Sequence, residues 1–265
     1  MPRSSRGTVR IVSLAPSATS ILCAIGARDY LVGVTKWCAD VAPVRNLPKL
    51  GDCWHMNSIE PILQLRPTLV IGSVPYKQET VARLLEERLN FLAMNPRSLE
   101  DIYGDIRLLG GIAGKPEPAN RLISRMRTAF ARIAQQARPA RIGALTSAPR
   151  VYCEAWPNPR ISSPPWVSEM VHIAGGKFAV RAGGRVTEDE VADSNPDVIV
   201  LAWAAAGDRS KVHRAYAVPE WNSVSAIQHR QVHVIRDEWL NTPGPPLLHG
   251  TKALARIIAR VRATP

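Results

Sequence analysis

Tryptophan is the residue type whose placement in this sequence most directly suggests a function. The chain has seven tryptophans but three phenylalanines. Five of the tryptophans stand in predicted loops or at predicted strand ends, several beside proline: Trp37, Trp54, Trp156, Trp166 and Trp239. Tryptophan offers a broad flat apolar surface and few rotamers to freeze, so such a set at a sheet edge suits a cleft for a large flat ligand. Any single one could equally be a core residue.

The motifs of common enzyme classes are missing. The sequence has no GxSxG elbow, no HExxH, no GxGxxG and no P-loop. The six histidines are dispersed, and the carboxylates form no two-metal cluster. We therefore expect no catalytic residue, no metal site and no required cofactor. An active site assembled from distant loops stays open as an alternative.

The four cysteines do not indicate a zinc site, because no CxxC pair occurs. Cys23 lies in an apolar helical pattern and is expected in the core. Cys38 and Cys53 both lie in predicted loops. A disulfide between those two stays open, and free thiols are the expected state.

The chain of 265 residues carries a net charge of +12. Its basic residues are scattered along helical segments rather than gathered into a patch, so we expect a basic surface and no nucleic-acid binding. No apolar run reaches the ~20 residues that span a bilayer. The first 20 residues contain no long apolar signal region, which leaves two readings: a cytoplasmic protein, or a start that lies upstream.

Short apolar runs alternate with helical patterns along most of the chain. Eight runs predict strands at 10–14, 31–34, 68–71, 90–94, 141–145, 151–154, 198–201 and 232–235. Such alternation is typical of mainly parallel sheets covered by helices, so the predicted fold class is α/β. After the first run, Ser17 or Thr19 is expected to cap a helix that Gly26 ends.

Residues 116–137 form the longest helical pattern. Apolar residues recur there at three- and four-residue steps, from Ala119 through Met126 to Ile133. About 20 residues at ~1.5 Å each give a rod of roughly 30 Å, close to one domain diameter. Because strands and helices resume after it, we predict a helix that joins two lobes.

Two segments share a template. In 60–71 and in 189–200, an acidic residue is followed by an apolar residue two positions later, a proline seven positions later and an apolar strand. One copy precedes the long helix and the other follows it. The repeat favours a pseudo-symmetric protein with one exposed carboxylate on each lobe, Glu60 and Asp189.

Five motifs resemble, in order and over most of the chain, the class III substrate-binding proteins of ABC importers. They are RIVSLAPSATSIL, WHMNSIEPILQLRPTLVI, WVSEMVHIAGG, VTEDEVADSNPDVIV and TPGPPLLHGTKALA. The run YCEAWPNP followed by PPWVSEMVHIAGG resembles the vitamin B12 (cobalamin)-binding branch. The resemblance implies two Rossmann-like α/β lobes at 8–114 and 139–265, a connecting helix at 115–138, and a corrinoid ligand in the cleft between the lobes. It also implies a monomer outside the cytoplasm that delivers the ligand to ABC permease subunits.

Roles for individual residues follow from the same resemblance. Trp54 matches a tryptophan that contacts the corrinoid, while Trp37 and Trp239 match aromatic residues that line the cleft. His55, beside Trp54, could reach the cobalt, although the family needs no such bond. Glu60 and Asp189 match the carboxylates that dock on transporter arginines.

The chain also departs from the family pattern. The common Arg-x-Gly-Pro-Arg loop here reads Thr242-Pro243-Gly244-Pro245-Pro246, so both arginines are lost and an anionic siderophore is disfavoured. Ser73 and Gly183 stand where some B12 binders carry tryptophans. Three other aromatic residues are expected to fill that space: Tyr76, Trp156 and Trp166.

Three alternatives stay open beside a corrinoid carrier. One is a ferric-siderophore or haem carrier of the same fold. Another is a cytoplasmic corrinoid-handling protein, suggested by the missing signal peptide. A third is an enzyme with this lobe architecture, which the lack of clustered cysteines disfavours.

Overall fold

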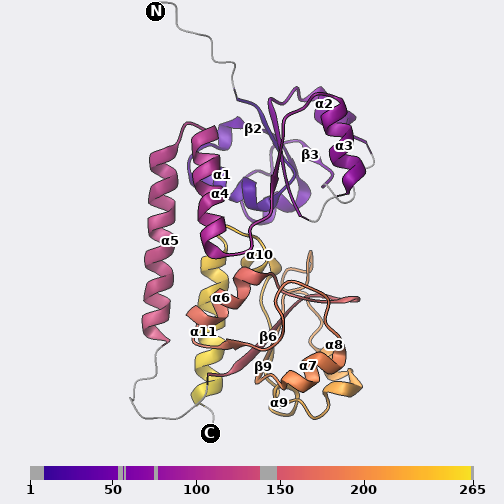
Figure 1. Cartoon of the computed structure of the whole chain (residues 1–265), viewed down its shortest axis with the longest axis vertical. Helices are drawn as coiled ribbons and strands as arrows, with labels where there is room; N and C mark the ends of the chain where they lie inside the picture. Colours follow the sequence, from indigo (N-terminus) through magenta and orange to yellow (C-terminus); the bar gives the residue numbers. More distant parts are fainter. Residues whose placement is uncertain (1–8, 53–55, 57, 75–76, 138–147, 264–265) are drawn as a thin grey trace, which may run out of the picture. The chain divides into compact units, whose positions relative to one another are not determined.

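The computed structural model describes residues 9–52, 56, 58–74, 77–137 and 148–263. Its contacts divide the chain into two compact units. Unit 1 comprises residues 1–96 and 101–123, and unit 2 comprises 97–100 and 124–265. Each unit has its own sheet (Figure 1).

Unit 1 is built on a five-stranded, all-parallel sheet in the order β3-β2-β1-β4-β5. The strands are β1 (Ile11–Ser13), β2 (Leu31–Thr35), β3 (Lys49–Leu50), β4 (Leu69–Ser73) and β5 (Phe91–Met94). The central strand β1 is buried along its length, as expected for a strand with helices on both faces. The four longer strands confirm the sequence predictions. β3 was not predicted, because two residues carry no periodicity.

The helices of unit 1 follow the expected alternation. They are α1 (Pro16–Ala24), η1 (Arg28–Tyr30), η2 (Lys36–Asp40), α2 (Glu60–Gln64), α3 (Gln78–Glu86) and α4 (Leu99–Ile112). The predicted cap of α1 is wrong: the N-cap is Ala15, and no side chain caps the helix. Pro16 starts it instead, because proline needs no hydrogen bond there. Gly26 does end it, with a φ of +75°.

The longest predicted helix is confirmed as α5 (Pro116–Gln136), 21 residues long. Its stripe from Ala119 to Ile133 is buried. The last turn of α4 packs closely against the first turn of α5, since a Cβ added to Gly110 would lie 2.5 Å from the Cβ of Ala119. The boundary between the two units falls inside α5, between Ile123 and Ser124. A linker helix spanning 115–138 stays a prediction.

Unit 2 holds a mixed sheet in the order β10-β9-β6-β7, with β8 also paired to β6. The strands are β6 (Arg150–Pro157), β7 (Arg160–Ser162), β8 (Lys177–Phe178), β9 (Val198–Leu201) and β10 (Val232–Val234). All pairs are parallel except the β6–β7 hairpin. The short β7 and β8 were not predicted, and the strand predicted at 141–145 lies outside the described residues.

Seven helical segments follow β7 in the described part of unit 2. They are α6 (Pro165–Ile173), α7 (Glu188–Ser194), α8 (His213–Tyr216), η3 (Pro219–Trp221), α9 (Ser225–Gln228), α10 (Asp237–Leu240) and α11 (Leu247–Ala263). Helix α11 packs against both α6 and α10 (Figure 1). At Gly250 the approach is so close that an added Cβ would lie 2.1 Å from the carbonyl oxygen of Trp239. Glycine at this position therefore lets α11 hold α10 in place.

The sheets confirm the predicted α/β class with two mainly parallel sheets. In unit 1, Val12 and Val70 of the sheet pack with Ile62 and Leu84 from the helices. In unit 2, Tyr152, Ile199 and Leu201 pack with the fully buried ring of Trp221.

None of the helices in the described residues is both long and apolar enough to cross a bilayer.

Candidate ligand-binding and docking residues

Trp37 lies at the carboxyl edge of the first sheet, where α/β proteins usually bind ligands. Strand β2 ends at Thr35, and η2 carries Trp37 immediately after it. The ring is half-buried, and the Nζ of Lys36 lies 4.4 Å from its centroid. The edge therefore presents part of an indole ring with a cation beside it.

Cys38 fixes the segment that carries Trp37. Its side chain is buried, and its sulfur lies 3.1 Å from Oγ1 of Thr19 and 3.2 Å from Oγ1 of Thr35. Burial raises the pKa of this thiol, so it stays protonated at neutral pH. Cys38 is a free thiol that ties η2 to α1 and β2.

In unit 2, Trp156 and Trp239 also stand near the carboxyl edge. Trp156, near the end of β6, is 42% exposed and donates its indole N–H to the carbonyl oxygen of Asn158 at 2.9 Å. Trp239, on α10, is half-buried, and its ring centroid lies 5.5 Å from that of the exposed His249. Both rings keep surface that a ligand could cover.

Trp166 has a different environment from the other candidates. Its side chain is 6% exposed, and its indole nitrogen donates to the carbonyl oxygen of Leu240 at 2.9 Å. The ring therefore belongs to the packing of α6 against α10 and leaves little surface for a ligand. Three further candidates, Trp54, His55 and Tyr76, lie outside the described residues.

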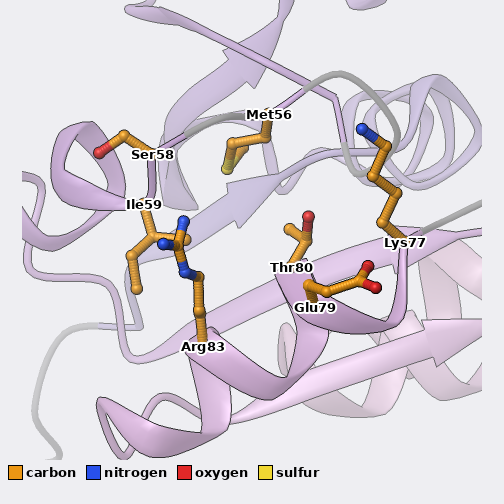
Figure 2. Close-up of a pocket in the computed structure, with 7 residues that line it drawn as sticks. All are labelled: Met56, Ser58, Ile59, Lys77, Glu79, Thr80 and Arg83. Atoms are coloured by element: carbon orange, nitrogen blue, oxygen red, sulfur yellow. The ribbon is translucent and has the colours of Figure 1, made fainter.

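A small pocket of about 240 Å³ lies beside the start of α2 (Figure 2). It is lined by Met56, Ser58, Ile59, Lys77, Glu79, Thr80 and Arg83. Figure 2 shows the residues that precede α2 facing Lys77 and the side chains of α3 across it. The volume is below the ~300 Å³ at which drug-sized ligands begin to fit, so a corrin ring cannot enter.

Sequence reasoning missed two half-buried side chains that each hold a buried acceptor oxygen: Asp237, the first residue of α10, and Asn241, which directly follows that helix. Both side chains bond the segment after β9: Oδ2 of Asp237 accepts from the backbone N–H of Ala205 at 3.3 Å, and Nδ2 of Asn241 donates to the carbonyl of Ala202 at 2.8 Å. The remaining oxygen of each, Oδ1, is buried and has no hydrogen-bond partner among the described residues. Two such acceptors one helical turn apart suit a ligand or water that donates hydrogen bonds.

The protonation of Asp237 is also unusual. Burial, helped by the neighbouring carboxylate of Glu238, raises the pKa of Asp237 from 3.8 to about 7. The carboxyl group is therefore divided between its neutral and ionised forms near neutral pH. No sequence signal marks it, because the effect depends on the packing of α10.

The docking candidates Glu60 and Asp189 occupy similar local positions. Glu60 is the first residue of α2 and Asp189 the second residue of α7, and both are exposed. The backbone N–H of Glu60 donates to Oγ of Ser58 at 3.2 Å. Helix α7 begins with a full capping box, in which Thr187 and Glu190 bond each other's backbone N–H. Each candidate carboxylate thus stands on a first helical turn, Glu60 alone on α2 and Asp189 between Glu188 and Glu190 on α7.

The sequence profile of the periplasmic binding protein family matches residues 11–238. The chain is 27% identical over 260 residues to the uncharacterized ABC transporter substrate-binding lipoprotein YvrC of Bacillus subtilis (strain 168), covering 94% of this chain and 79% of that protein.

Two solved structures share the fold. The apo periplasmic heme-binding protein RhuT from Roseiflexus sp. RS-1 is 24% identical with a TM-score of 0.80, over 96% of this chain and 99% of that one. The periplasmic vitamin B12 binding protein BtuF of Vibrio cholerae is 24% identical with a TM-score of 0.74, over 96% and 97%. One binds haem and the other vitamin B12, so likeness of fold does not select the ligand.

Proposed function

Because this chain belongs to the periplasmic binding protein family, we propose that it captures cobalamin or a related corrinoid and delivers it to an ABC importer. Members of the family are substrate-binding transport proteins rather than enzymes, and they bind their ligands without a cofactor. The family acts outside the cytoplasm, and we place this protein there as well. The lipoprotein YvrC suggests that a membrane anchor is compatible with such a chain.

The observation that carries the choice of ligand is the pair of buried, unpartnered oxygens on Asp237 and Asn241. A corrinoid is rimmed with amide side chains, each of which offers two N–H donors. The carboxylates of haem accept but do not donate hydrogen bonds, so they would leave Oδ1 of Asn241 unsatisfied and would be repelled by the ionised form of Asp237. The arginine-free loop 242–246 supports the same choice, since it offers no guanidinium to a carboxylate.

Aromatic surface supplies the rest of the proposed site. Each unit offers such surface by itself: Trp37 stands near the carboxyl edge of unit 1, and Trp156 and Trp239 stand near that of unit 2, each with part of its ring exposed or half-buried. Flat rings at such positions suit a macrocycle, because they bury a large area with little loss of side-chain entropy. Trp54 remains part of the proposal on sequence grounds.

A haem carrier is the second candidate, and one observation favours it. His249 is exposed, and its ring lies 5.5 Å from that of Trp239. A neutral imidazole is a common ligand of haem iron. A carrier of this kind would need His249 for binding, whereas the corrinoid proposal does not.

Glu60 and Asp189 are proposed to dock on arginines of the permease subunits. Both carboxylates are exposed, and the sequence template repeats their placement in both units. A carboxylate pairs with an arginine fork through two parallel hydrogen bonds, which fixes orientation as well as position. The Glu60→Gln and Asp189→Asn variants should therefore bind ligand normally and lose stimulation of the importer in proteoliposomes.

Titration of the purified protein with cyanocobalamin tests the ligand, using calorimetry and the visible spectrum of the corrinoid. We expect one site, weakened at least about tenfold by Trp239→Ala, since truncation of a central aromatic contact costs about 2 kcal/mol or more. Tyr216→Ala is the matched control, because Tyr216 is an exposed aromatic on α8. Saturable haem binding that is lost in His249→Ala, without cobalamin binding, would replace the corrinoid by haem.

A further inference from the structure

Unit 2 contains a second pocket, of about 250 Å³, beside the β6–β7 hairpin. Its lining residues are Glu154, Pro157, Asn158, Arg160, Trp203, Arg214, Ala215 and Ala217. They come from the β6–β7 hairpin, from the segment after β9, and from α8 and the residue that follows it. Figure 1 labels β6, β9 and α8. We call it the Arg160 pocket. Its volume is too small for a macrocycle, so it is not the proposed corrinoid site.

The carboxylate in this pocket is already fully engaged. Glu154 is 1% exposed. Its Oε2 accepts from the hydroxyl of Tyr152 at 2.9 Å and from Nη1 of Arg160, and its Oε1 accepts from the indole N–H of Trp203 at 2.8 Å. Burial first, and then Glu154, raise the pKa of Tyr152, so its hydroxyl keeps the proton that it donates. Three hydrogen-bond donors therefore satisfy this carboxylate, and one of them, Arg160, also compensates its charge.

The guanidinium of Arg160 forms ion pairs, but one of its nitrogens has no hydrogen-bond partner among the described residues. Its side chain is 9% exposed, and its Nη2 lies 3.2 Å from Oε1 of Glu188. The ring of Trp221 lies 4.3 Å beneath it. Its Nε is buried and has no hydrogen-bond partner among the described residues. A buried N–H of a charged group without an acceptor is rare, and it suggests a missing partner that accepts a hydrogen bond.

Arg214 places a second cation at the same pocket. Its Cζ lies 5.9 Å from the ring of Trp203, and its side chain forms no ion pair within the described part of the chain. The titratable groups that face the pocket are thus two guanidiniums and the satisfied Glu154. Glu188, 46% exposed, meets Arg160 without lining the pocket. The groups at this pocket that remain available to a ligand are therefore N–H donors of positively charged side chains.

We propose that the Arg160 pocket binds a small carboxylate with a compact apolar body. Its oxygens would accept from Arg160 and Arg214, while the apolar body would lie against Trp203, Pro157 and the alanines of α8. Such a carboxylate is either a free small acid or an acidic substituent of a larger ligand. The proposal for this site is independent of the corrinoid proposal, and it stays valid even if cobalamin does not bind.

The experiment is an NMR titration with benzoate, following the indole N–H signal of Trp203, which a Trp203→Phe variant assigns. We expect a saturable shift with benzoate and at least about tenfold weaker binding of benzamide, which lacks the charge. Arg214→Gln should weaken benzoate binding about tenfold or more, while Arg209→Gln, an exposed arginine outside the pocket, should not. Arg160→Lys should also weaken it, but this variant risks unfolding, so Arg214→Gln carries the decision.

Three outcomes would overturn this site. They are no shift of the Trp203 signal, equal binding of benzamide, and an unchanged titration in Arg214→Gln, which would mean adventitious binding only. Competition separates the two sources of the carboxylate. A free acid leaves the affinity for haem unchanged when benzoate is present, whereas a carboxylate substituent of a larger ligand such as haem gives mutual displacement with benzoate. Cyanocobalamin binding is measured in the same samples, so loss of one site is distinguishable from loss of the other.

Discussion

The two units bury polar groups of different kinds. In unit 1, every buried polar residue of the described chain is a serine or a threonine, such as Ser13 and Thr35. Unit 2 buries two carboxylates as well, Glu154 and Glu238. Hydroxyl groups are satisfied by neutral local bonds at any pH, whereas a buried charge needs a partner of opposite sign. Unit 1 should therefore depend less than unit 2 on the charge of fully buried side chains.

The largest expected effect tests the buried charge directly. Glu154→Gln removes the charge that compensates the nearly buried Arg160, so it should destabilise the protein by about 3–5 kcal/mol. Urea denaturation followed by circular dichroism measures this loss. Glu220→Gln, at an exposed position, is the control and should change stability by less than about 0.5 kcal/mol.

A double variant sharpens the same prediction. Glu154→Gln combined with Arg160→Met removes both charges and should recover part of the loss, because no uncompensated cation remains. A single Glu154→Gln variant as stable as the parent protein would show that the ion pair adds nothing, and the contrast between the two units would then fail.

The second effect is the pH dependence that Asp237 gives to unit 2, which adds to that of Asp105 in unit 1, whose pKa burial raises to about 6. The native pKa of Asp237, about 7, lies above its ordinary value of 3.8, so between these values the native state holds more protons than the unfolded state. The free energy of unfolding should then fall as pH rises from about 4 to about 7. Asp237→Asn should remove this component of the slope and stabilise the protein above pH 7 by at most a few kcal/mol, at about 1.4 kcal/mol per unit of pKa.

Urea denaturation at several pH values checks this slope. Asp193→Asn is the matched control, because Asp193 is exposed on α7 and should leave the slope unchanged. Equal slopes for the parent protein and Asp237→Asn would mean that Asp237 titrates normally. The acceptor role proposed for it in ligand binding would then lose its electrostatic support as well.

The third effect tests the neutral network of unit 1. Oγ1 of Thr19 donates to Oγ of Ser13 at 2.8 Å and lies 3.1 Å from the sulfur of Cys38. Thr19→Val keeps the shape but leaves these groups with fewer partners, which should cost about 1–3 kcal/mol. Thermal unfolding should show the same loss at pH 5 and pH 8, because no charge is involved. A pH-dependent loss would contradict the contrast.

The positions of strands could be predicted wherever a mostly apolar segment of four or more residues occurs. Strands β1, β2, β4 and β5 follow such runs in unit 1, as do β6, β9 and β10 in unit 2. The two-residue β3 and β8 have no periodicity to detect. The hairpin strand β7 follows Pro157-Asn158-Pro159, which looks like a loop in sequence, so its pairing with β6 was missed.

The candidate site was predictable to a smaller extent. A tryptophan after a strand was enough to place Trp37, Trp156 and Trp239 near carboxyl edges. The same rule failed to identify Trp166 as a core residue, because its environment comes from α10, some 74 residues away along the chain. The unsatisfied oxygen of Asp237 and the hydrogen bonds of Glu154 also depend on distant segments. Local sequence carries no signal for such contacts.

The smallest effect concerns the two helices that carry the docking carboxylates. Thr187→Ala removes the reciprocal cap of α7 and should destabilise the protein by about 1 kcal/mol, whereas Ser58→Ala removes a single 3.2 Å bond at α2 and should cost a few tenths. Chemical denaturation measures both, with Ser223→Ala at an exposed position outside the named helices as the control.

The same variants bear on docking. A weakened cap lets the first turn of α7 fray, which reduces the time that Asp189 spends in a fixed position. Thr187→Ala should therefore lower importer stimulation slightly without changing ligand affinity, and less than Asp189→Asn does. Equal stimulation by the parent protein and by both Asp189→Asn and Thr187→Ala would remove α7 from the docking surface and leave Glu60 on α2 to be tested alone.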